Sequence, residues 1–440
     1  MKKTTVSYHP REQVTRTALA VWWGAVAVYI VAIFGRTSFG VASMDAMARF
    51  EVSASQIAVF TAVQVGVYAA AQVPTGLAID RFGPRFMLVS GAVVMAAGQI
   101  ALGLTTSYGL ALAARALIGL GDATAFLSVM RILPYWFPPR KTPLYTQLTG
   151  ALGQLGQFLS AVPFLALLGA RGWTVAFVSL GALGLIFALV AALVVSDSPE
   201  WSAMTREQRR EVHAQKRAQR VPLAFTLRTV VRSPIAWEAF FIHGWVIFWM
   251  FSFSLLWGVP LMTQGMGLSE AQAGTALILF SVGNVIAAPI MGVVSARLGV
   301  RRDLASLWIG AIVPIAFAVL FASPEPRGFG AALVVTSLLG LCMPAGNFGF
   351  DTLREYLPAE MVATGTGLAN MGGFLACMIG SQLVGVLLDW SAGGAEFTWA
   401  DFRIAWLAFF GTAAVCLIGL LVSRRKAKRI TRHVPIVSRT

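Results

Sequence analysis

Residues 76–86 read GLAIDRFGPRF, and their polar part, from Asp80 onward, follows directly on an apolar, uncharged run that ends at Ile79. Pro84 cannot continue a helix, and Gly83 can adopt the positive φ that a sharp reversal requires. The stretch therefore predicts a polar hairpin that ends one apolar helix and starts the next. The pattern recurs at residues 292–302, GVVSARLGVRR, where four residues lie 216 positions after their counterparts: Gly76 and Gly292, Arg81 and Arg297, Gly83 and Gly299, Arg85 and Arg301.

The composition indicates a membrane protein. Of 440 residues, 57% are hydrophobic and 12% are charged, whereas a soluble globular chain has about 25% charged residues. Apolar runs of the roughly 20 residues that a spanning helix needs recur along the chain. We therefore expect an all-α polytopic membrane protein with twelve transmembrane helices. The expected spans are roughly 17–47, 55–79, 86–105, 108–134, 143–168, 172–195, 237–264, 270–296, 303–322, 328–353, 360–389 and 402–423.

The basic residues predict the orientation. With both termini cytoplasmic, Arg36 and Arg115 fall inside spans and only four arginines fall on the external side: Arg49, Arg171, Arg327 and Arg403. This asymmetry agrees with the positive-inside rule, so the net charge of +15 reflects topology and not nucleic-acid binding. The polar N-terminal stretch shows no cleavable signal peptide. We expect a multi-pass protein of the plasma membrane, the inner membrane in bacteria.

The duplication predicts the domain organisation. The charged stretch after Asp197 divides the expected spans six and six. The predicted units are an N-terminal six-helix half (1–197), a cytoplasmic central loop (198–234) and a C-terminal six-helix half (235–440). A duplicated helical unit is typical of secondary transporters, whose substrate site lies between the repeats near the midplane.

Charges inside apolar spans are the first candidates for a functional site, because they are costly unless they are paired or face water. Arg36 can bind an anionic substrate with its forked guanidinium, or it can have a structural role. Asp122 lies two helical turns after Arg115, on the same face, and can pair with either Arg36 or Arg115. It can exchange protons during transport, or it can form a static ion pair that fixes helix packing.

Further candidates come from the second half and from the turn. His243 can serve as a second proton site or as a hydrogen-bonded structural residue. Trp249 and Asn347 are candidates to face the substrate, although tryptophans in such a span also serve as packing residues. Asp80 ends its helix, where a carboxylate is poorly placed relative to the helix dipole, so we expect it to find an arginine or the start of another helix.

The turn resembles the loop 2–3 signature of the major facilitator superfamily, and RALIGLGDA at residues 115–123 is similar to its second motif. The resemblance covers the whole chain. It implies that Asp80 holds the second helix against the start of the eleventh, which reads ATGTGLANMGG. Arg81, Gly83, Arg85 and Arg115 are candidates for the same latch, and a simple hairpin with its arginines at the cytoplasmic face is the alternative. Two departures are Pro84, where a basic residue is usual, and Ala296, which replaces the acid of the second copy. One latch rather than two then depends on a carboxylate.

The segment GRTSFGVASMDAM at residues 35–47 and LPYWFPPRK at residues 133–141 resemble the anion:cation symporter branch. Members of that branch carry organic anions with protons or sodium. The resemblance implies that Arg36 binds substrate and Asp122 takes part in coupling, while Gly35 stands where many members have an acid.

The predicted function is secondary transport of a small organic anion by alternating access with proton coupling. A proton-driven efflux antiporter and a membrane sensor or scaffold that transports nothing are the alternatives. Helix 5 lacks the Gly-Pro-x-x-Gly-Gly ending of drug antiporters. Because the chain shows no P-loop lysine and no helical zinc pattern, we predict neither an enzyme, nor a cofactor, nor a metal site. The predicted partners are substrate, coupling ion and membrane lipid, with the protein a monomer.

Overall fold

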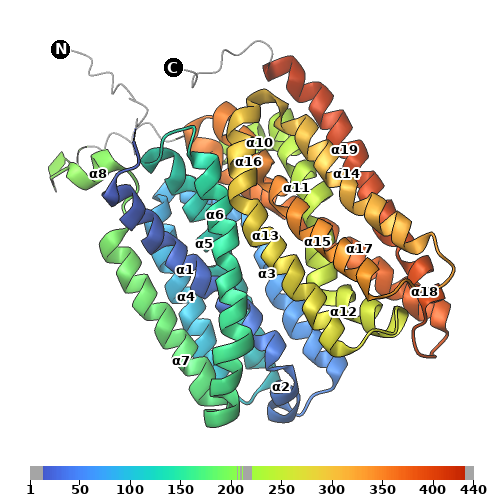
Figure 1. Cartoon of the computed structure of the whole chain (residues 1–440). Helices are drawn as coiled ribbons and strands as arrows, with labels where there is room; N and C mark the ends of the chain where they lie inside the picture. The colour runs from blue at the N-terminus through green and yellow to red at the C-terminus, as the bar shows by residue number, and fades with distance from the viewer. Residues whose placement is uncertain (1–12, 206, 209–210, 212–220, 432–440) are drawn as a thin grey trace.

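The computed structural model describes residues 13–205, 207–208, 211 and 221–431, and within them it contains helices and no strand (Figure 1). The parts of the predicted central loop at 206, 209–210 and 212–220 lie outside the described residues, as do both chain ends. The helices that precede this loop form the N-terminal set: α1 (Arg16–Val41), α2 (Ser43–Phe50), α3 (Ala54–Phe82), α4 (Pro84–Leu104), α5 (Tyr108–Trp136), α6 (Thr142–Leu159) and α7 (Leu165–Val194).

Two short helices, α8 (Pro199–Ala203) and α10 (Leu223–Arg232), belong to the central loop. The remaining helices form the C-terminal set: α11 (Pro234–Ser252), α12 (Gly258–Pro260), α13 (Glu270–Leu298), α14 (Arg302–Phe321), α15 (Phe329–Cys342), α16 (Phe348–Tyr356), α17 (Val362–Ala392), α18 (Trp399–Ala405) and α19 (Leu407–Thr431). Several helices are joined without a break by π-helical turns, Ser160–Phe164 and Phe253–Trp257, or by 3₁₀ turns such as Met343–Asn347, and a third π-helical turn, Leu261–Gly265, extends α12.

Ten segments of the described residues are long and apolar enough to cross a membrane. Two of them, Thr142–Val194 and Glu270–Phe321, contain 53 and 52 residues. A straight helix of that length would measure about 80 Å, against about 30 Å of bilayer hydrocarbon. Each segment is interrupted by a glycine with positive φ, Gly172 at 77° in the first and Gly299 at 51° in the second. The helical class is thus confirmed, while the count of twelve spans stays a prediction.

The turn at residues 83–84 forms as its sequence predicts. Gly83 adopts φ 91°, a value that favours glycine, and Pro84 is the first residue of α4, where its missing N–H is not needed. In the second copy, Gly299 also has a positive φ, and a 3₁₀ turn, Gly299–Arg301, stands in place of the proline. Both turns therefore reverse the chain at a glycine.

The repeat extends back to the helix starts. Ser53 and Gln56 cap α3 reciprocally: the Gln56 backbone N–H donates to Ser53 Oγ, and the Ser53 N–H donates to Gln56 Oε1. Ser269 and Gln272 cap α13 in the same way. Ser53 and Ser269 are 216 positions apart, the separation of the two turns. Such boxes satisfy backbone N–H groups that have no partner within the helix, so the same local signal defines both helices.

Two seams join the N-terminal set to the C-terminal set. In the first, α3 crosses α17 so closely that a Cβ atom on Gly76 would lie 2.6 Å from the carbonyl oxygen of Ala363. In the second, α13 crosses α6, and a Cβ on Gly292 would lie 2.6 Å from the Cα of Leu144. Gly76 and Gly292 are repeat counterparts. Equivalent glycines therefore allow backbone to approach backbone at both seams.

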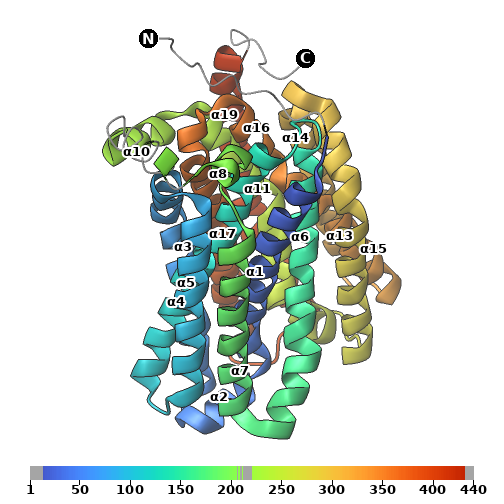
Figure 2. The ribbon, with the colours of Figure 1, turned by 90° about the vertical axis from the view of Figure 1, so that its left-hand side faces the viewer.

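Both ends of the described chain lie at the same end of the bundle. The start of α1 and the end of α19 are found there together with α8 and α10, whereas α2 and α18 lie at the opposite end (Figures 1 and 2). We call the end that holds the start of α1 and the end of α19 the termini side. The turns after α3 and α13 and the start of α17 also lie on the termini side, so the polar residues of both turns gather at one end.

Candidate functional site

Arg36 of α1 and Asp122 of α5 form a two-bond ion pair. Arg36 Nε donates to Asp122 Oδ2 at 2.6 Å, and a terminal guanidinium nitrogen donates to Oδ1 at 2.9 Å. The Asp122 side chain is fully buried, while 18% of the Arg36 side chain remains exposed. Of the two partners that the sequence left open, the structure pairs Asp122 with Arg36. Both carboxylate oxygens are occupied, and a small part of the Arg36 side chain remains exposed.

Aromatic side chains surround the guanidinium and bring both sets of helices to it. The Arg36 Cζ atom lies 4.5 Å from the ring centre of Tyr68 in α3 and 5.9 Å from that of Phe374 in α17. Phe374 also contacts Phe251 of α11, with ring centres 4.6 Å apart. The face of an aromatic ring attracts a cation, and this attraction is stronger where water is excluded. The pair therefore lies at the junction of the two sets.

A polar network continues from Tyr68 into the C-terminal set. The Asn370 side-chain amide of α17 donates to the Tyr68 hydroxyl at 3.2 Å and to Gln72 Oε1 at 2.8 Å. Neither Tyr68 nor Asn370 was identified from the sequence. The available signal was a tyrosine and an asparagine in otherwise apolar spans, where polar side chains bond between helices. That signal does not reveal that the two residues meet across the seam.

His243 lies at the far end of this network. Its Nδ1 carries a hydrogen, because it bonds the carbonyl oxygen of Gly346, which can only accept, at 3.2 Å. The ring also interacts with the side chain of Asn370 and packs against Phe350. Asp122 and His243, the two residues that the sequence suggested for proton coupling, are therefore linked through Arg36, Tyr68 and Asn370. Their role in coupling stays a prediction.

Asp80 binds the start of α17. Its carboxylate accepts from the backbone N–H groups of Ala363 and Thr364 at 3.1 and 2.8 Å, and from the Thr364 hydroxyl at 2.7 Å. Arg131 Nε of α5 adds a fourth bond at 3.2 Å. A carboxylate is well placed at the first turn of a helix, where N–H groups lack partners. The contact ties α3 to α17 on the termini side, and its action as a latch stays a prediction.

The other residues of the turn hold the turn itself. Asp197, which follows α7, accepts from the Arg85 backbone N–H at 2.8 Å, and it also lies against Gly83. The Arg85 side chain donates to the carbonyl oxygen of Ala192. Arg81 is exposed. Within the described residues, these contacts join α3, α4 and the end of α7, and they do not reach α17.

The second seam has its own polar contact. Asp351 of α16 accepts from the hydroxyl of Ser295 at 2.5 Å and pairs with Arg354, three residues further along the same helix, at 3.1 Å. Arg354 in turn donates to Thr146 of α6 at 2.9 Å. The link between the sets is therefore made here by an arginine, which a carboxylate from α16 holds in place. Ala296 stands where the first copy has Asp80, and as an alanine it contributes no charge.

Replacing Asp80 with asparagine should shift the protein toward a state that is open on the termini side. The amide loses the charge that attracts Arg131 and the α17 N–H groups, and hydrogen bonds to charged groups are worth about 1.5–3 kcal/mol. A cysteine in place of buried Thr75, next to the seam, should then react with an impermeant maleimide about tenfold faster. Asp303→Asn is the control, because Asp303 pairs with Arg424 inside the C-terminal set. Equal labelling rates in the Asp80→Asn and Asp303→Asn variants would show that Asp80 does not act as a latch.

The structure places three further residues that the sequence suggested, and their predicted roles stay predictions. Trp249 is 1% exposed and stacks on Phe317 in the aromatic core of the C-terminal set. Arg115 does not belong to the contacts of the turn: it lies over the ring of Phe39 and makes a weak 3.5 Å bond to the carbonyl of Phe60. Asn347 donates to Gln147 Oε1 of α6 at 3.0 Å, so it joins the two sets.

Trp249→Ala is expected to reduce stability. The Trp249 ring lies 5.4 Å from that of Phe317 and 5.8 Å from that of Phe409, and truncation of a buried tryptophan costs about 3–5 kcal/mol. The apparent Tm in detergent should fall clearly, whereas Trp308→Ala, at a residue 69% exposed, should change it little. A small Tm change with a large loss of substrate affinity would restore the binding role.

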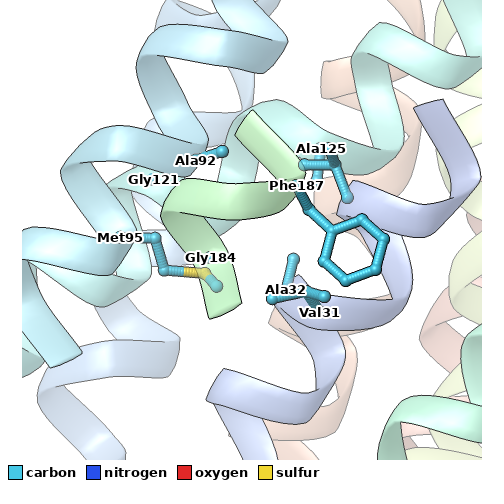
Figure 3. Close-up of a pocket in the computed structure, with 9 residues that line it drawn as sticks. Val31, Ala32, Ala92, Met95, Gly121, Ala125, Gly184 and Phe187 are labelled. Carbon is cyan, nitrogen blue, oxygen red and sulfur yellow. The ribbon is translucent and has the colours of Figure 1, made fainter. Parts of the chain in front are cut away.

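Figure 3 shows a small apolar cavity among α1, α4, α5 and α7. Residues such as Ala32, Met95, Gly121 and Phe187 line it, and its volume is about 10 Å³. A single water molecule needs at least about this volume and polar partners as well. The cavity is therefore a packing gap inside the N-terminal set and not a substrate site.

Comparisons with known proteins extend over most of the chain. The family model of the Major Facilitator Superfamily matches residues 25–381 and also residues 255–437. A probable sulfoacetate transporter of Cupriavidus necator is 25% identical over 82% of this chain and 85% of the relative. A probable nitrate/nitrite transporter of Mycobacterium tuberculosis is 27% identical (86% and 90%). A hexuronate transporter of Bacillus subtilis is 23% identical (88% and 91%).

Proposed function

The chain belongs to the Major Facilitator Superfamily, and from this membership we propose that it carries a small organic anion across the membrane by alternating access coupled to protons. As a member with apolar helices along its length, it is a multi-pass membrane protein. Two of the relatives named above are probable transporters of sulfoacetate and of nitrate/nitrite, and the third is a hexuronate transporter; all of these solutes are anions. This common property supports an anion as the substrate of this chain.

The observation that carries the proposal is the Arg36–Asp122 pair. A guanidinium that binds both oxygens of one carboxylate, at 2.6 and 2.9 Å, has the geometry to bind both oxygens of another carboxylate or of a sulfonate. The exposed part of Arg36 gives a substrate anion access to it. When the anion takes the guanidinium, Asp122 loses its partner in a buried place and favours its neutral form.

Competition for Arg36 then couples the two solutes. Anion binding promotes protonation of Asp122, and protonation releases Arg36 for the anion, so each favours the other by the same factor. Anion and proton would therefore travel together. Tyr68 and Asn370 connect this event to α17, so the occupancy of Arg36 can influence the seam that closes the termini side.

The orientation and the organisation belong to the same proposal. We place the termini side in the cytoplasm and the protein, a monomer, in the plasma membrane. Residues 1–197 and 235–440 act as two six-helix halves that rock about the central site, with residues 198–234 as the connecting loop. The distribution of basic residues and the paired glycine turns support this arrangement.

Uptake into proteoliposomes tests the function. The purified chain would be offered radiolabelled sulfoacetate, a hexuronate and tartrate, with the outside either more acidic than the inside or at the same pH. We expect one or more of these anions to accumulate above the external concentration only with the pH gradient. Liposomes that contain the Arg36→Lys variant control for leakage. If none of the anions is taken up or exchanged under either condition, anion transport is contradicted and a sensor or scaffold becomes the better hypothesis.

A further inference from the structure

The central-loop helix α10 exposes apolar side chains on a face that does not touch the bundle. Its buried residues, Thr226 and Val230, face the rest of the protein. Leu223, Leu227 and Val231 follow one another at intervals of four residues, so they share one face of the helix, and they are 40%, 38% and 42% exposed. We call these three residues the apolar stripe. A surface helix of a soluble protein turns its apolar residues to the core, whereas α10 turns most of them outward.

Two arginines lie beside the apolar stripe. Arg228 and Arg232 are also four residues apart and both are exposed, and within the described residues neither forms a salt bridge with a carboxylate. Each follows a residue of the stripe, so the arginines stand roughly 100° around the helix from it. The sequence of α10 contains no acid. The helix therefore has three faces: one against the bundle, one apolar and one positively charged.

The chain passes directly from α10 into a helix that is long and apolar enough to span a membrane. Only Ser233 separates α10 from α11, which begins at Pro234. Ser233 is extended, as expected for a residue before proline, and its hydroxyl caps α11 by accepting from the backbone N–H of Ala236 at 3.4 Å. One helix therefore ends and the next begins at this residue. As a result, α10 lies at the level where α11 enters the bilayer.

The neighbours of α10 are typical of the boundary between bilayer and water. The indole N–H of Trp237 in α11 donates to the carbonyl oxygen of Val231 at 2.7 Å, which satisfies a carbonyl in the last turn of α10. Tryptophan is enriched at this boundary. The helix also contacts α3, whose last residue, Phe82, is 53% exposed. Figure 2 shows α10 at the edge of the bundle on the termini side, where its outward faces can meet lipid.

We propose that α10 is a binding surface for anionic lipid of the leaflet on the termini side. The apolar stripe enters the boundary between headgroups and acyl chains, while Arg228 and Arg232 bind the phosphates of the headgroups. Amphipathic helices bind membranes in this way, through buried apolar area together with electrostatic attraction to anionic lipid. A second copy of this chain would also cover the stripe, but it would bring a second pair of unpaired arginines to the contact. The positive face therefore favours anionic lipid over a dimer.

Fluorescence quenching on the purified full-length chain in nanodiscs tests where α10 lies. No transported solute is present, so the result does not depend on the proposed function. The native cysteines are buried, so a bimane label reports on an introduced cysteine. In Leu227→Cys, lipids brominated on their acyl chains should quench the label and aqueous iodide should not. In Arg228→Cys, on the next face, the order should be reversed. Equal iodide quenching at both positions places α10 in water, and a Leu227→Cys label shielded from both quenchers indicates a protein partner. Either result overturns the proposal.

A second arm separates anionic lipid from lipid in general. The Leu227→Cys label is titrated in phosphatidylcholine nanodiscs with either brominated phosphatidylglycerol or brominated phosphatidylcholine, and we expect the first to quench at lower fractions. Arg228→Gln combined with Arg232→Gln should lower the apparent affinity for phosphatidylglycerol about tenfold or more. Arg425→Gln combined with Arg429→Gln is the control, because it removes two exposed arginines four residues apart at the end of α19, and it should leave quenching at α10 unchanged. Equal quenching by the two lipids, or an equal effect of the two double variants, overturns the proposal.

Discussion

Transport should fall about 10- to 100-fold when Arg36 is replaced by lysine, even though the positive charge is kept. Arg36 uses two nitrogens to bind the two oxygens of Asp122, and a substrate carboxylate or sulfonate would use the same fork. A lysine ammonium is a point charge that cannot make this paired contact. Loss of one charge-assisted hydrogen bond is worth about 1.5–3 kcal/mol, which is equivalent to that range of rates.

Initial uptake rates in proteoliposomes would measure this effect, normalised to correctly folded protein. Lysine can still neutralise Asp122, so expression and thermal stability should remain near those of the unmodified chain. Arg81→Lys is the matched control, because it makes the same change at an exposed arginine. Arg81 lies at the turn after α3 and does not contact Asp122 within the described residues. An Arg36→Lys variant that transports at the full rate would exclude two-oxygen recognition of the substrate.

Asp122→Asn should separate exchange from accumulation. Asparagine has the shape of the protonated acid but cannot release a proton, and it removes the charge that competes for Arg36. We expect the variant to exchange labelled for unlabelled substrate between loaded sides, because this process needs no net proton movement. Uphill accumulation driven by a pH gradient should be lost almost completely, since the coupled proton no longer travels with the anion.

The two assays use the same vesicles, so the ratio of gradient-driven uptake to exchange is the decisive quantity. Asp45→Asn changes an exposed carboxylate in α2 and should leave the ratio unaltered. If Asp122→Asn vesicles still concentrate substrate when a pH gradient is imposed, Asp122 is a packing residue. His243, which is linked to it through Asn370, or a sodium-driven mechanism would then explain the coupling.

The sequence was a good guide where local chemistry decides the outcome. Gly83 and Pro84 specify a turn by their own backbone restrictions, and Asp80 needs a partner because it ends a helix. Arg36 and Asp122 could be identified because a charge in an apolar span requires a partner. The partner of Asp122 had to come from the structure, because Arg36 and Arg115 both satisfied the sequence argument.

The remaining errors and omissions concern which face of a helix points where. Trp249 lies in a nearly uniformly apolar helix, so no pattern distinguishes the core from a cavity, and the structure places it in the core. Tyr68 and Asn370 are 302 positions apart, and their contact depends on the crossing of α3 and α17. Gly76 indicated a turn in the sequence, whereas its close approach to Ala363 became visible only in the structure.

The two glycine seams have a consequence for turnover. At Gly76 and at Gly292, the neighbouring helix presents mainly backbone atoms, so separation does not require a long side chain to leave a pocket. Each atom pair at such a contact contributes only about 0.1–0.2 kcal/mol, and the seams can part without a large desolvation step. Part of the activation barrier then lies in the polar contacts that cross the seams, those of Asp80 and Asn370 at the first and of Arg354 and Asn347 at the second. The cycling rate should therefore respond strongly to changes at these four residues.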